Sequence, residues 1–211
     1  MPDSPDANRG KGATVKADEP FNLLIAGVGG QGVLTLGGLV VHAAVRAGLD
    51  VKQSEIHGMA QRGGSVSTHV RIGRKVFSPV IDEGAAQLLV ALEKLEALRY
   101  LHYLAPDGLL IVDDRAIPPL PVSSGALEYP PDVLDRCRAH AARVEVYSGE
   151  ALASTIASAR MLNTCFAGIV SRHLPFDESA WHAALAECFA ARHLEANRQA
   201  FDHGRQARPR V

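Results

Sequence analysis

The sequence predicts an α/β fold, a Rossmann-like three-layer sandwich with a mostly parallel sheet and a helical C-terminus. Short apolar runs alternate with helical patterns between residues 21 and 147, which is typical of doubly wound sheets. A glycine-rich turn directly follows the first run, as it does in nucleotide-binding folds of this class. After residue 147 only helical patterns remain, so helices should form the C-terminal part.

The first strand, helix and second strand are predicted in residues 21–56. Residues 21–26 are mostly apolar and end at a glycine, as expected of an inner strand covered on both faces. Residues 31–47 predict a helix that is apolar almost all round, with Gly48 as its C-terminal cap. Residues 51–56 predict a second strand, which completes a βαβ unit with a right-handed crossover.

The segment 66–72 has a different pattern, because apolar residues or threonine alternate strictly with polar residues. Such alternation is typical of a strand with one packed face and one face that meets water or a partner. The expected packed residues are Val66, Thr68, Val70 and Ile72, and the expected polar ones are Ser67, His69 and Arg71.

Two further buried strands are predicted in residues 88–92 and 109–112. Both runs are wholly apolar and too short for a helix. Between them, residues 93–104 predict a helix that Pro106 and Gly108 terminate.

Residues 117–131 contain five prolines, so we expect an extended excursion or a loop there and no helix. A last strand is expected in residues 144–147. Three helical patterns follow it, in residues 150–157, 162–173 and 178–206, the last with a break near Arg192.

The length of 211 residues, with 47% hydrophobic content, suits one domain with a substantial core. We expect a disordered N-terminal tail in residues 1–19, a single α/β domain in residues 20–206 and a short tail in residues 207–211. The first twenty residues are too polar to pack and lack the apolar core of a secretory signal. The longest apolar stretch, 33–45, falls short of the roughly 20 residues that a membrane span needs.

The charge balance and the cysteines limit the partners and the compartment. A net charge of -1 and a pI near 6.8 provide no basic field for a nucleic acid, so we expect no nucleic-acid partner. Cys137, Cys165 and Cys188 are widely spaced and match neither a disulfide framework nor a metal site. We therefore expect a reducing, cytoplasmic location and no bound metal in this chain.

The glycine-rich turn is the first candidate site. It contains Gly27, Gly29, Gly30, Gln31 and Gly32. The G-x-G-x-x-G spacing between a strand and a helix lets an anionic ligand approach the backbone at the helix N-terminus. Glu55, at the end of the second predicted strand, is placed as the acidic residue that meets a ribose hydroxyl in dinucleotide enzymes. The same glycines could serve only to pack helix against strand, so both interpretations stay open.

The segment 54–64 is the second candidate site. Its glycines permit backbone conformations that other residues resist, so the loop can fold tightly while presenting polar side chains. Arg62 offers a planar fork for a carboxylate or a phosphate, and Gln61 adds a donor and an acceptor. In the alternative interpretation, Arg62 is exposed or paired within the chain and His57 caps the strand. The residues assigned here are His57, Gln61, Arg62, Gly63 and Gly64.

Three stretches of the sequence resemble the γ-type subunit of 2-oxoacid:ferredoxin oxidoreductases. They are the two candidate segments, GVGGQGVL and SEIHGMAQRGGSV, and the later stretch SPVIDEGAAQLLVALEKLEALR. The similarity is to the indolepyruvate (aryl pyruvate) branch and covers about residues 21–201. It implies oxidative decarboxylation of an aryl 2-oxoacid with coenzyme A, giving an aryl-acetyl-CoA, carbon dioxide and reduced ferredoxin. It also implies a hetero-oligomer, in which a large partner chain holds thiamin diphosphate, magnesium and iron–sulfur clusters.

The sequence lacks the residues that this chemistry needs, so we expect no catalytic residue in this chain. Thiamin diphosphate is usually held after a Gly-Asp-Gly signature, which does not occur here. Iron–sulfur clusters need closely spaced cysteines, and the three here are isolated. The glycine turn and the second segment are therefore assigned to a binding or docking surface, with the anionic tail of coenzyme A or a partner loop as the occupant.

Two rival functions stay open. The glycine turn and Glu55 also suit a free-standing nicotinamide-dependent dehydrogenase, and a nucleotide or acyl-CoA sensing module without an enzyme partner is the second rival. The paired Asp113 and Asp114 after a strand could be functional or could support a turn or a helix cap before Ile117. Trp181 is expected to anchor the last helices onto the sheet or a partner.

Overall fold

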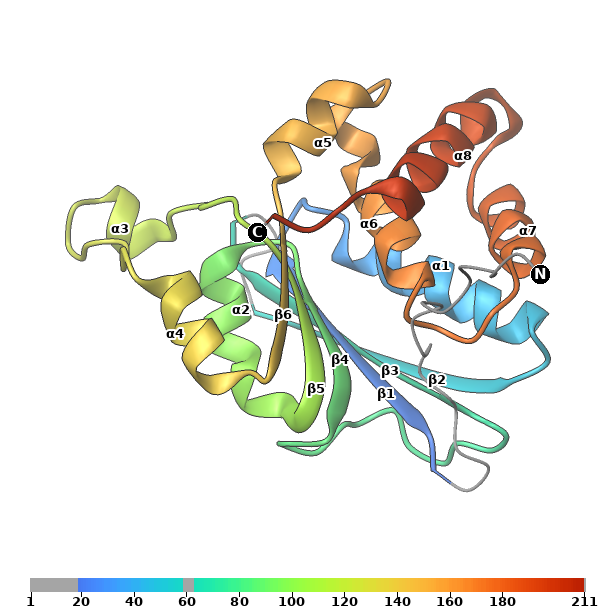
Figure 1. Ribbon diagram of the computed structural model, residues 1–211, viewed down its shortest axis with the longest axis horizontal. Coiled ribbons are helices and arrows are strands. Elements are labelled where there is room, and N and C mark those ends of the chain that lie inside the picture. Colours follow the sequence, from blue (N-terminus) through green and yellow to red (C-terminus); the bar gives the residue numbers. More distant parts are fainter. Residues whose placement is uncertain (1–18, 59–62, 211) are drawn as a thin grey trace, which may run out of the picture.

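The computed structural model describes residues 19–58 and 63–210, and it contains a six-stranded sheet between two layers of helices (Figure 1). The strands are β1 (Phe21–Val28), β2 (Asp50–His57), β3 (Ser65–Gly73), β4 (Ala86–Ala91), β5 (Leu104–Asp113) and β6 (Arg143–Tyr147). The α-helices are α1 (Val33–Arg46), α2 (Lys94–Tyr100), α3 (Leu120–Ser123), α4 (Val133–His140), α5 (Gly149–Thr155), α6 (Leu162–Ser171), α7 (Glu178–Cys188) and α8 (Ala191–Gln206). Two 3₁₀ turns are η1 (Leu101–Tyr103) and η2 (Ala159–Met161). The predicted fold class is confirmed.

The strand order β2-β3-β1-β4-β5-β6 differs in one respect from the expected doubly wound sheet. Strands β1, β4, β5 and β6 are parallel neighbours, whereas β3 is antiparallel to both β1 and β2 and lies between them. The βαβ unit of β1, α1 and β2 is therefore split by an inserted strand. Only seven residues separate His57 from Ser65, and a parallel connection needs about a dozen or more, so the chain must turn back on itself.

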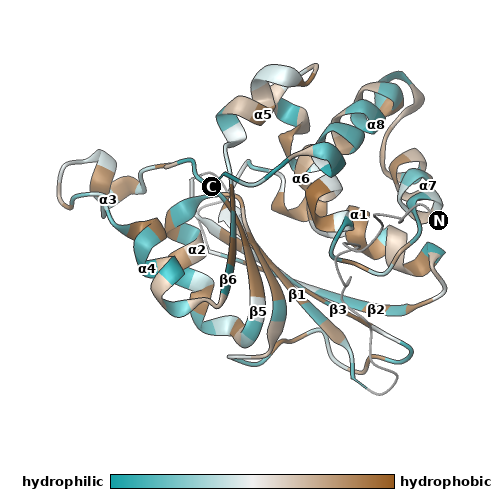
Figure 2. Cartoon of the chain, viewed as in Figure 1, coloured by the Kyte–Doolittle hydropathy of each residue, from teal (hydrophilic) through white to brown (hydrophobic). Residues whose placement is uncertain are grey.

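The two faces of the sheet have separate apolar cores, because successive residues of a strand point to opposite sides. On β1, Leu23 and Ile25 pack with α1 and α6, while Leu24 packs on the other face with Val133 and Cys137 of α4. Figure 2 shows the central strands largely brown, in keeping with burial on both faces. The prediction of an inner first strand is confirmed.

The polar face of β3 is buried, which corrects the expectation that it meets water or a partner. Ser67 is 0% exposed and His69 is 1% exposed. The segment after β3 folds back over this face, where the amide of Ile81 donates to Nδ1 of His69 at 3.1 Å. The ring of Tyr103 stands edge-on to His69 with centroids 5.3 Å apart. Burial lowers the pKa of His69.

The region from α2 to β6 departs from the sequence predictions in three places. Helix α2 ends at Tyr100, and β5 already begins at Leu104, so Pro106 and Gly108 lie within a strand and do not terminate the helix. The register of β5 against β4 shifts there, which accommodates them.

Helix α3 shows that the expectation of no helix among the prolines is wrong. Its proline at position 121 lies in the first turn, where the missing N–H group is not needed. Helix α4 was not predicted, because its composition is mostly polar and only Val133 and Cys137 are buried.

The C-terminal helices α5 to α8 follow the predicted patterns. Gly48 has a φ of 76° after α1, which confirms the predicted cap. The expected break near Arg192 lies at residues 189–190, between α7 and α8. Trp181 is fully buried against Phe176 and Phe201, so it anchors the last two helices as predicted.

The chain ends beside the last strand. The amide of Arg210 donates to the carbonyl of Val146 at 2.7 Å, which forms an isolated antiparallel bridge with β6. Apart from residue 19, the tail expected in residues 1–19 falls outside the described residues. Among the helices that the structure describes, none has both the length and the apolar character that crossing a bilayer requires.

Candidate functional site

The two segments singled out from the sequence meet at one edge of the sheet. The glycine turn follows the carboxyl end of β1, and the second segment follows the carboxyl end of β2, which points the same way. The amide of Gly29 donates to the carbonyl of Gly64 at 2.8 Å. We call this contact region the junction: residues 27–32 together with Gly63 and Gly64. Ligands of open α/β sheets bind at this edge.

The side chain of Gln31 braces the turn from within. Its Oε1 accepts from the amide of Val28 at 2.7 Å, and its Nε2 donates to the carbonyl of Leu92. The backbone amide of Gln31 also donates to the carbonyl of Val28, at 3.0 Å. Gln31 thereby ties the end of β1 to the residue that follows β4.

The glycines of the turn have different roles. A Cβ at Gly27 would lie 2.9 Å from Cγ2 of Val33, so this glycine allows α1 to pack closely on β1. Gly32 has a φ of 82°, and a Cβ there would overlap the side chain of Asn163. Among the residues that the structure describes, no atom lies within 4 Å of the corresponding position at Gly30.

Helix α1 begins directly after the turn and presents its N-terminus at the junction. Gly32 is its N-cap residue, without a side-chain hydrogen bond, and its first turn contains no acidic residue. The first bond of the helix runs from the amide of Leu36 to the carbonyl of Gly32 at 2.9 Å. The amides of Val33, Leu34 and Thr35 therefore lie ahead of the intrahelical ladder, at the positive end of the dipole.

The polar residues of the second segment are spread along the edge strand. His57 is exposed at the end of β2, with Nδ1 3.3 Å from the carbonyl oxygen of Gly58. Glu55 is also exposed on β2, and Nε2 of Gln53 donates to it at 3.3 Å. Because β3 lies between β2 and β1, Glu55 is two strand spacings, roughly 9–10 Å, from β1. Gln61 and Arg62 lie outside the described residues.

A hydrogen-bonded group that sequence reasoning missed supports the junction from the α2 side. The hydroxyl of Ser65, next to Gly64, donates to Oε2 of Glu96 and lies 3.2 Å from the hydroxyl of Tyr100. Glu93 is 1% exposed and accepts from the amide of Glu96 at 2.9 Å, which caps α2. The spacing of two glutamates three residues apart at a helix start was the available signal.

Glu93 also holds the proline-rich segment against the sheet edge. It accepts from the amide of Ile117 at 3.0 Å and from the hydroxyl of Tyr129 at 2.6 Å. Burial and the hydrogen bond to Glu93 raise the pKa of Tyr129, so its hydroxyl stays protonated and donates. The junction, α2 and the proline-rich segment thus form one connected group at the carboxyl edge.

Asp113 supports the turn before Ile117, one of the roles expected from the sequence, because its Oδ1 accepts from the amide of Arg115 at 3.2 Å. It is fully buried at the end of β5, and its Oδ1 accepts from the amide of Gly149, the first residue of α5, at 3.0 Å. Nε of Arg115 donates to its Oδ2 at 2.6 Å. Burial raises the pKa of Asp113, and the charge of Arg115 opposes that rise. Asp114 pairs with Arg210.

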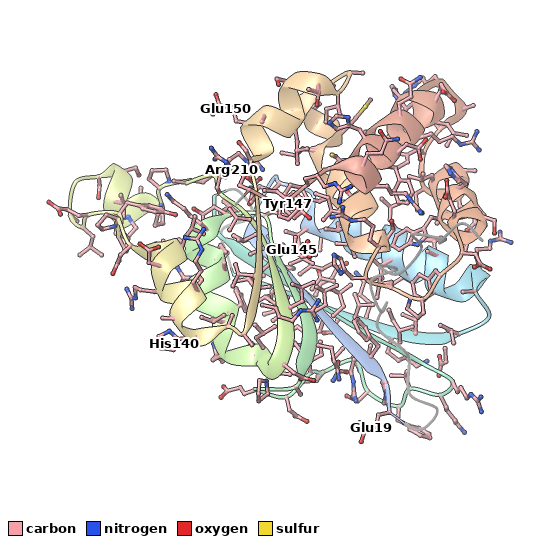
Figure 3. All side chains as sticks on the ribbon, viewed as in Figure 1. Glu19, His140, Glu145, Tyr147, Glu150 and Arg210 are labelled. Carbon is pink, nitrogen blue, oxygen red and sulfur yellow. The ribbon has the colours of Figure 1, made fainter. Side chains whose placement is uncertain are left out.

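A second ionic cluster fastens the C-terminal segment to β6, and Figure 3 shows Glu145 and Tyr147 on that strand with Arg210 toward the same end. The hydroxyl of Tyr147 donates to Glu145 at 2.7 Å, and Arg172 donates to the carbonyl of Ala207 at 2.6 Å. Burial alone would raise the pKa of Glu145, but hydrogen bonds from His173 and Tyr147 and the charge of Arg172 lower it to about 2.

Two surface groups of ionisable side chains lie away from the junction. His42 and Arg46, one turn apart on α1, both contact Glu187 of α7. Donor atoms of Glu178, His182 and Asp202 lie within 4.8 Å of one another. Arg205 already pairs with Glu178 at 3.3 Å, so this group is accounted for as an ion-pair network.

The cysteines do not form a site that could hold a cluster. Cys137 and Cys165 are buried on opposite faces of the sheet, and burial raises their pKa to about 11 and about 12. Cys188 is exposed at the end of α7. Thiolates are the ligands that iron–sulfur clusters need, so the described residues do not fit such a group.

Residues 22–207 match the family model described as pyruvate ferredoxin/flavodoxin oxidoreductase, so the chain belongs to this family. It is a subunit of an oxidoreductase complex, as the sequence resemblance predicted.

Curated relatives place the chain in the indolepyruvate branch of the family. It is 38% identical over 188 residues to the indolepyruvate oxidoreductase subunit IorB of Archaeoglobus fulgidus, covering 87% of this chain and 93% of that protein. It is 34% identical over 194 residues to the subunit IorB of Thermococcus kodakarensis, covering 89% and 95%.

Solved structures share the fold. The pyruvate oxidoreductase subunit PORC from Thermotoga maritima has a TM-score of 0.68 at 18% identity, covering 90% of this chain and 97% of that one. The 2-oxoglutarate:ferredoxin oxidoreductase from Magnetococcus marinus has a TM-score of 0.68 at 18% identity, covering 92% of this chain and 34% of that longer chain. At this identity the likeness concerns the fold alone.

Proposed function

We propose that this subunit supports the thiamin-dependent oxidative decarboxylation of an aryl 2-oxoacid such as indolepyruvate. In this reaction the 2-oxoacid and coenzyme A give an aryl-acetyl-CoA and carbon dioxide, and two electrons pass to ferredoxin. The relatives are indolepyruvate oxidoreductase subunits, which supports the substrate class. The observation that carries the proposal is the hydrogen bond between Gly29 and Gly64, which joins both candidate segments into one surface.

The catalytic cofactors of the proposed reaction belong to a large partner chain. The acyl carbanion needs an electron sink, supplied by thiamin diphosphate with magnesium, and iron–sulfur clusters carry single electrons onward. The cysteines of this chain are too far apart for a cluster, and no Gly-Asp-Gly segment is present for the diphosphate. This subunit therefore acts in a hetero-oligomer, in the cytoplasm, with ferredoxin as the acceptor for the whole complex.

The junction is the surface that we assign to contact with the partner and with coenzyme A. Its glycine turn, which has no described side chain over Gly30, and the N-terminus of α1, which has no side-chain cap, present backbone amides at the carboxyl edge. Arg62 and Gln61, in the loop between β2 and β3, add side-chain donors in this proposal. A surface of this kind can close a reaction chamber and exclude water, while the reacting groups lie on the partner.

The rival proposal of a free-standing nicotinamide-dependent dehydrogenase is disfavoured by the sheet order. In dinucleotide enzymes the acidic residue follows the strand next to β1, whereas Glu55 lies on β2, beyond the inserted β3. Micromolar binding of NAD or NADP to the isolated chain, measured by calorimetry, would favour this rival. The second rival, a nucleotide-sensing module without a partner, predicts that the chain purifies alone.

Purification from the native host tests the proposal directly. We expect the chain to co-elute with a much larger, brown, thiamin-dependent protein. The complex should reduce ferredoxin or a viologen dye when an aryl pyruvate and coenzyme A are supplied, and the isolated chain should not. Turnover of a 2-oxoacid by the isolated chain would overturn the proposal, as would elution without a partner.

A further inference from the structure

The proline-rich segment after β5 closes into a compact loop at the carboxyl edge of the sheet. The amide of Ile117 and the hydroxyl of Tyr129 donate to the same carboxylate oxygen, Oε1 of Glu93, at 3.0 and 2.6 Å. The two ends of the stretch 117–129 therefore lie side by side, and we call this stretch the arm. Compact surface loops whose ends meet in this way frequently have a function.

Backbone hydrogen bonds hold the arm in one conformation. Within α3 the amide of Ser124 donates to the carbonyl of Leu120, and beyond the helix the amide of Leu127 donates back to the carbonyl of Pro121, both at 2.9 Å. Gly125, with a φ of 78°, permits the turn between them. Three of the first five residues of the arm are prolines, which fix φ. Binding through the arm therefore loses little conformational entropy.

The arm displays apolar side chains to the solvent. Leu120 is 79% exposed and Leu127 is 64% exposed, and Figure 1 shows α3 standing apart from the sheet. Residues 116–127 contain no charged residue and no histidine. A single exposed leucine is ordinary. Two on one rigid and uncharged loop indicate a surface that binds another protein.

Phe77, which is 85% exposed, has a different setting. It lies between β3 and β4, in a segment that leaves the sheet at the opposite, amino edge. Nζ of Lys75 lies 5.0 Å from the centre of its ring, and Arg74, Asp82 and Glu83 belong to the same segment. Charged groups keep that segment hydrated. Phe77 is therefore a suitable control for the arm.

The position of the arm identifies its occupant as the partner subunit. Glu93, which holds both ends of the arm, also accepts from the amide of Glu96, and Glu96 accepts from the hydroxyl of Ser65, beside Gly64 of the junction. The arm and the junction thus belong to one hydrogen-bonded edge. The proposed function places the partner at the junction, and an interface of ordinary size covers about 800 Å² on each side. An interface of that extent reaches beyond the junction along this edge.

We propose that the arm is a docking element that inserts Leu120 and Leu127 into an uncharged, apolar groove of the large partner subunit. The inference rests on the proposed function for the existence of that subunit, and it adds a second contact that is separate from the junction. Both leucines leave water when they enter the groove, and this burial is the driving force. Because the arm has no charge, its contribution to affinity should depend little on salt.

The test is calorimetric titration of the purified large subunit with the full chain and its variants. Leu120→Ser and Leu127→Ser should each raise the Kd of assembly by about tenfold or more, since each removes a buried leucine from the interface. This factor should be nearly the same at about 0.05 and about 0.5 M salt. The subunit concentration that gives half-maximal ferredoxin reduction, with aryl pyruvate and coenzyme A supplied, should rise by the same factor.

Two controls separate docking from folding. Phe77→Ser removes an even more exposed apolar side chain at the other edge and should change the Kd by less than about twofold. Leu127→Met keeps the apolar volume and should assemble almost normally. Because all three positions are exposed, the Tm of each isolated variant should match that of the unaltered chain. A lower Tm in the leucine variants would show that these side chains stabilise their own chain, against the proposal.

The arm and the proposed function can fail separately. An unchanged Kd for both serine variants, in a complex that oxidises an aryl pyruvate, overturns the arm alone, as does equal weakening by Phe77→Ser. If the serine variants abolish self-association of the isolated chain and leave the Kd for the large subunit unchanged, the arm binds a second copy and the inference is wrong. A complex that depends on the leucines but oxidises no aryl pyruvate supports the arm and refutes the proposed reaction. Absence of any complex refutes both.

Discussion

Replacing Gln31 by methionine tests whether its side chain holds the glycine turn in place. The change keeps a similar volume but removes both hydrogen bonds, to the amide of Val28 and to the carbonyl of Leu92. Val28 is 7% exposed and Leu92 is 1% exposed, so both backbone groups lose their partners in a largely buried place. Each such loss costs about 1–3 kcal/mol.

Gln31 itself is only half-buried, so water can replace part of what is lost. We therefore expect the free energy of unfolding to fall by about 2 kcal/mol, toward the low end of the combined range. With a urea dependence of about 2 kcal/mol per M, the unfolding midpoint should fall by about 1 M. Urea titration followed by circular dichroism measures this shift.

Gln87→Met is the matched control, because it removes a single hydrogen bond, from the amide of Asn22, at the opposite end of the same strands. Gln87 is exposed, so the free energy of unfolding should fall by less than about 1 kcal/mol. Equal midpoints for the two variants would refute the role of Gln31 as a brace.

Three further predictions concern the loop between β2 and β3, the contact of α6 with α8, and the loss of stability at acid pH. Arg62→Ala should depress aryl pyruvate oxidation by the reconstituted complex while circular dichroism shows an intact fold; unchanged turnover and coenzyme A affinity would contradict a role in the shared site. Gly168→Ala should lower stability by about 3 kcal/mol, since its Cβ would overlap the backbone of α8 at Phe201; an unchanged Tm would disprove this close contact. The pKa of Glu145 is lowered from 4.5 to about 2, so its ionised form stabilises the fold above about pH 4.5, and this stability is lost as the pH falls toward 2. In urea titrations at several pH values, Glu145→Gln should reduce the fall in the free energy of unfolding between about pH 4.5 and 2. The same fall in both proteins would argue against this role of Glu145.

The sequence was sufficient for the elements that depend on local pattern. Apolar runs located β1, β4 and β5, and helical periodicity located α1 and the four C-terminal helices. The strand order could not be predicted from the sequence, because β3 pairs with both β1 and β2 through contacts that no local pattern encodes. Burial of His69 was missed for the same reason, since the cover comes from a later segment.

The candidate site was predictable only where a motif marks it. Both glycine-containing segments stand out in the sequence, and the structure joins them through Gly29 and Gly64. Asn163 belongs to no recognisable motif and contacts Gly32 only through the tertiary fold. Ser65 and Glu93 lie in recognisable segments, but their hydrogen bonds with Glu96 are set by the tertiary fold and by the start of α2. Single polar residues of this kind are common in any sequence, so their proximity to the turn could not be foreseen.

The pairing of Arg210 with Val146 limits how this protein can associate. An open sheet flank invites another strand to add to it, but the backbone of the chain itself already occupies part of the flank at β6. The opposite flank, β2, displays the charged residues Lys52 and Glu55, which discourage strand addition. Both flanks of the sheet are thus protected against the addition of a strand from another subunit.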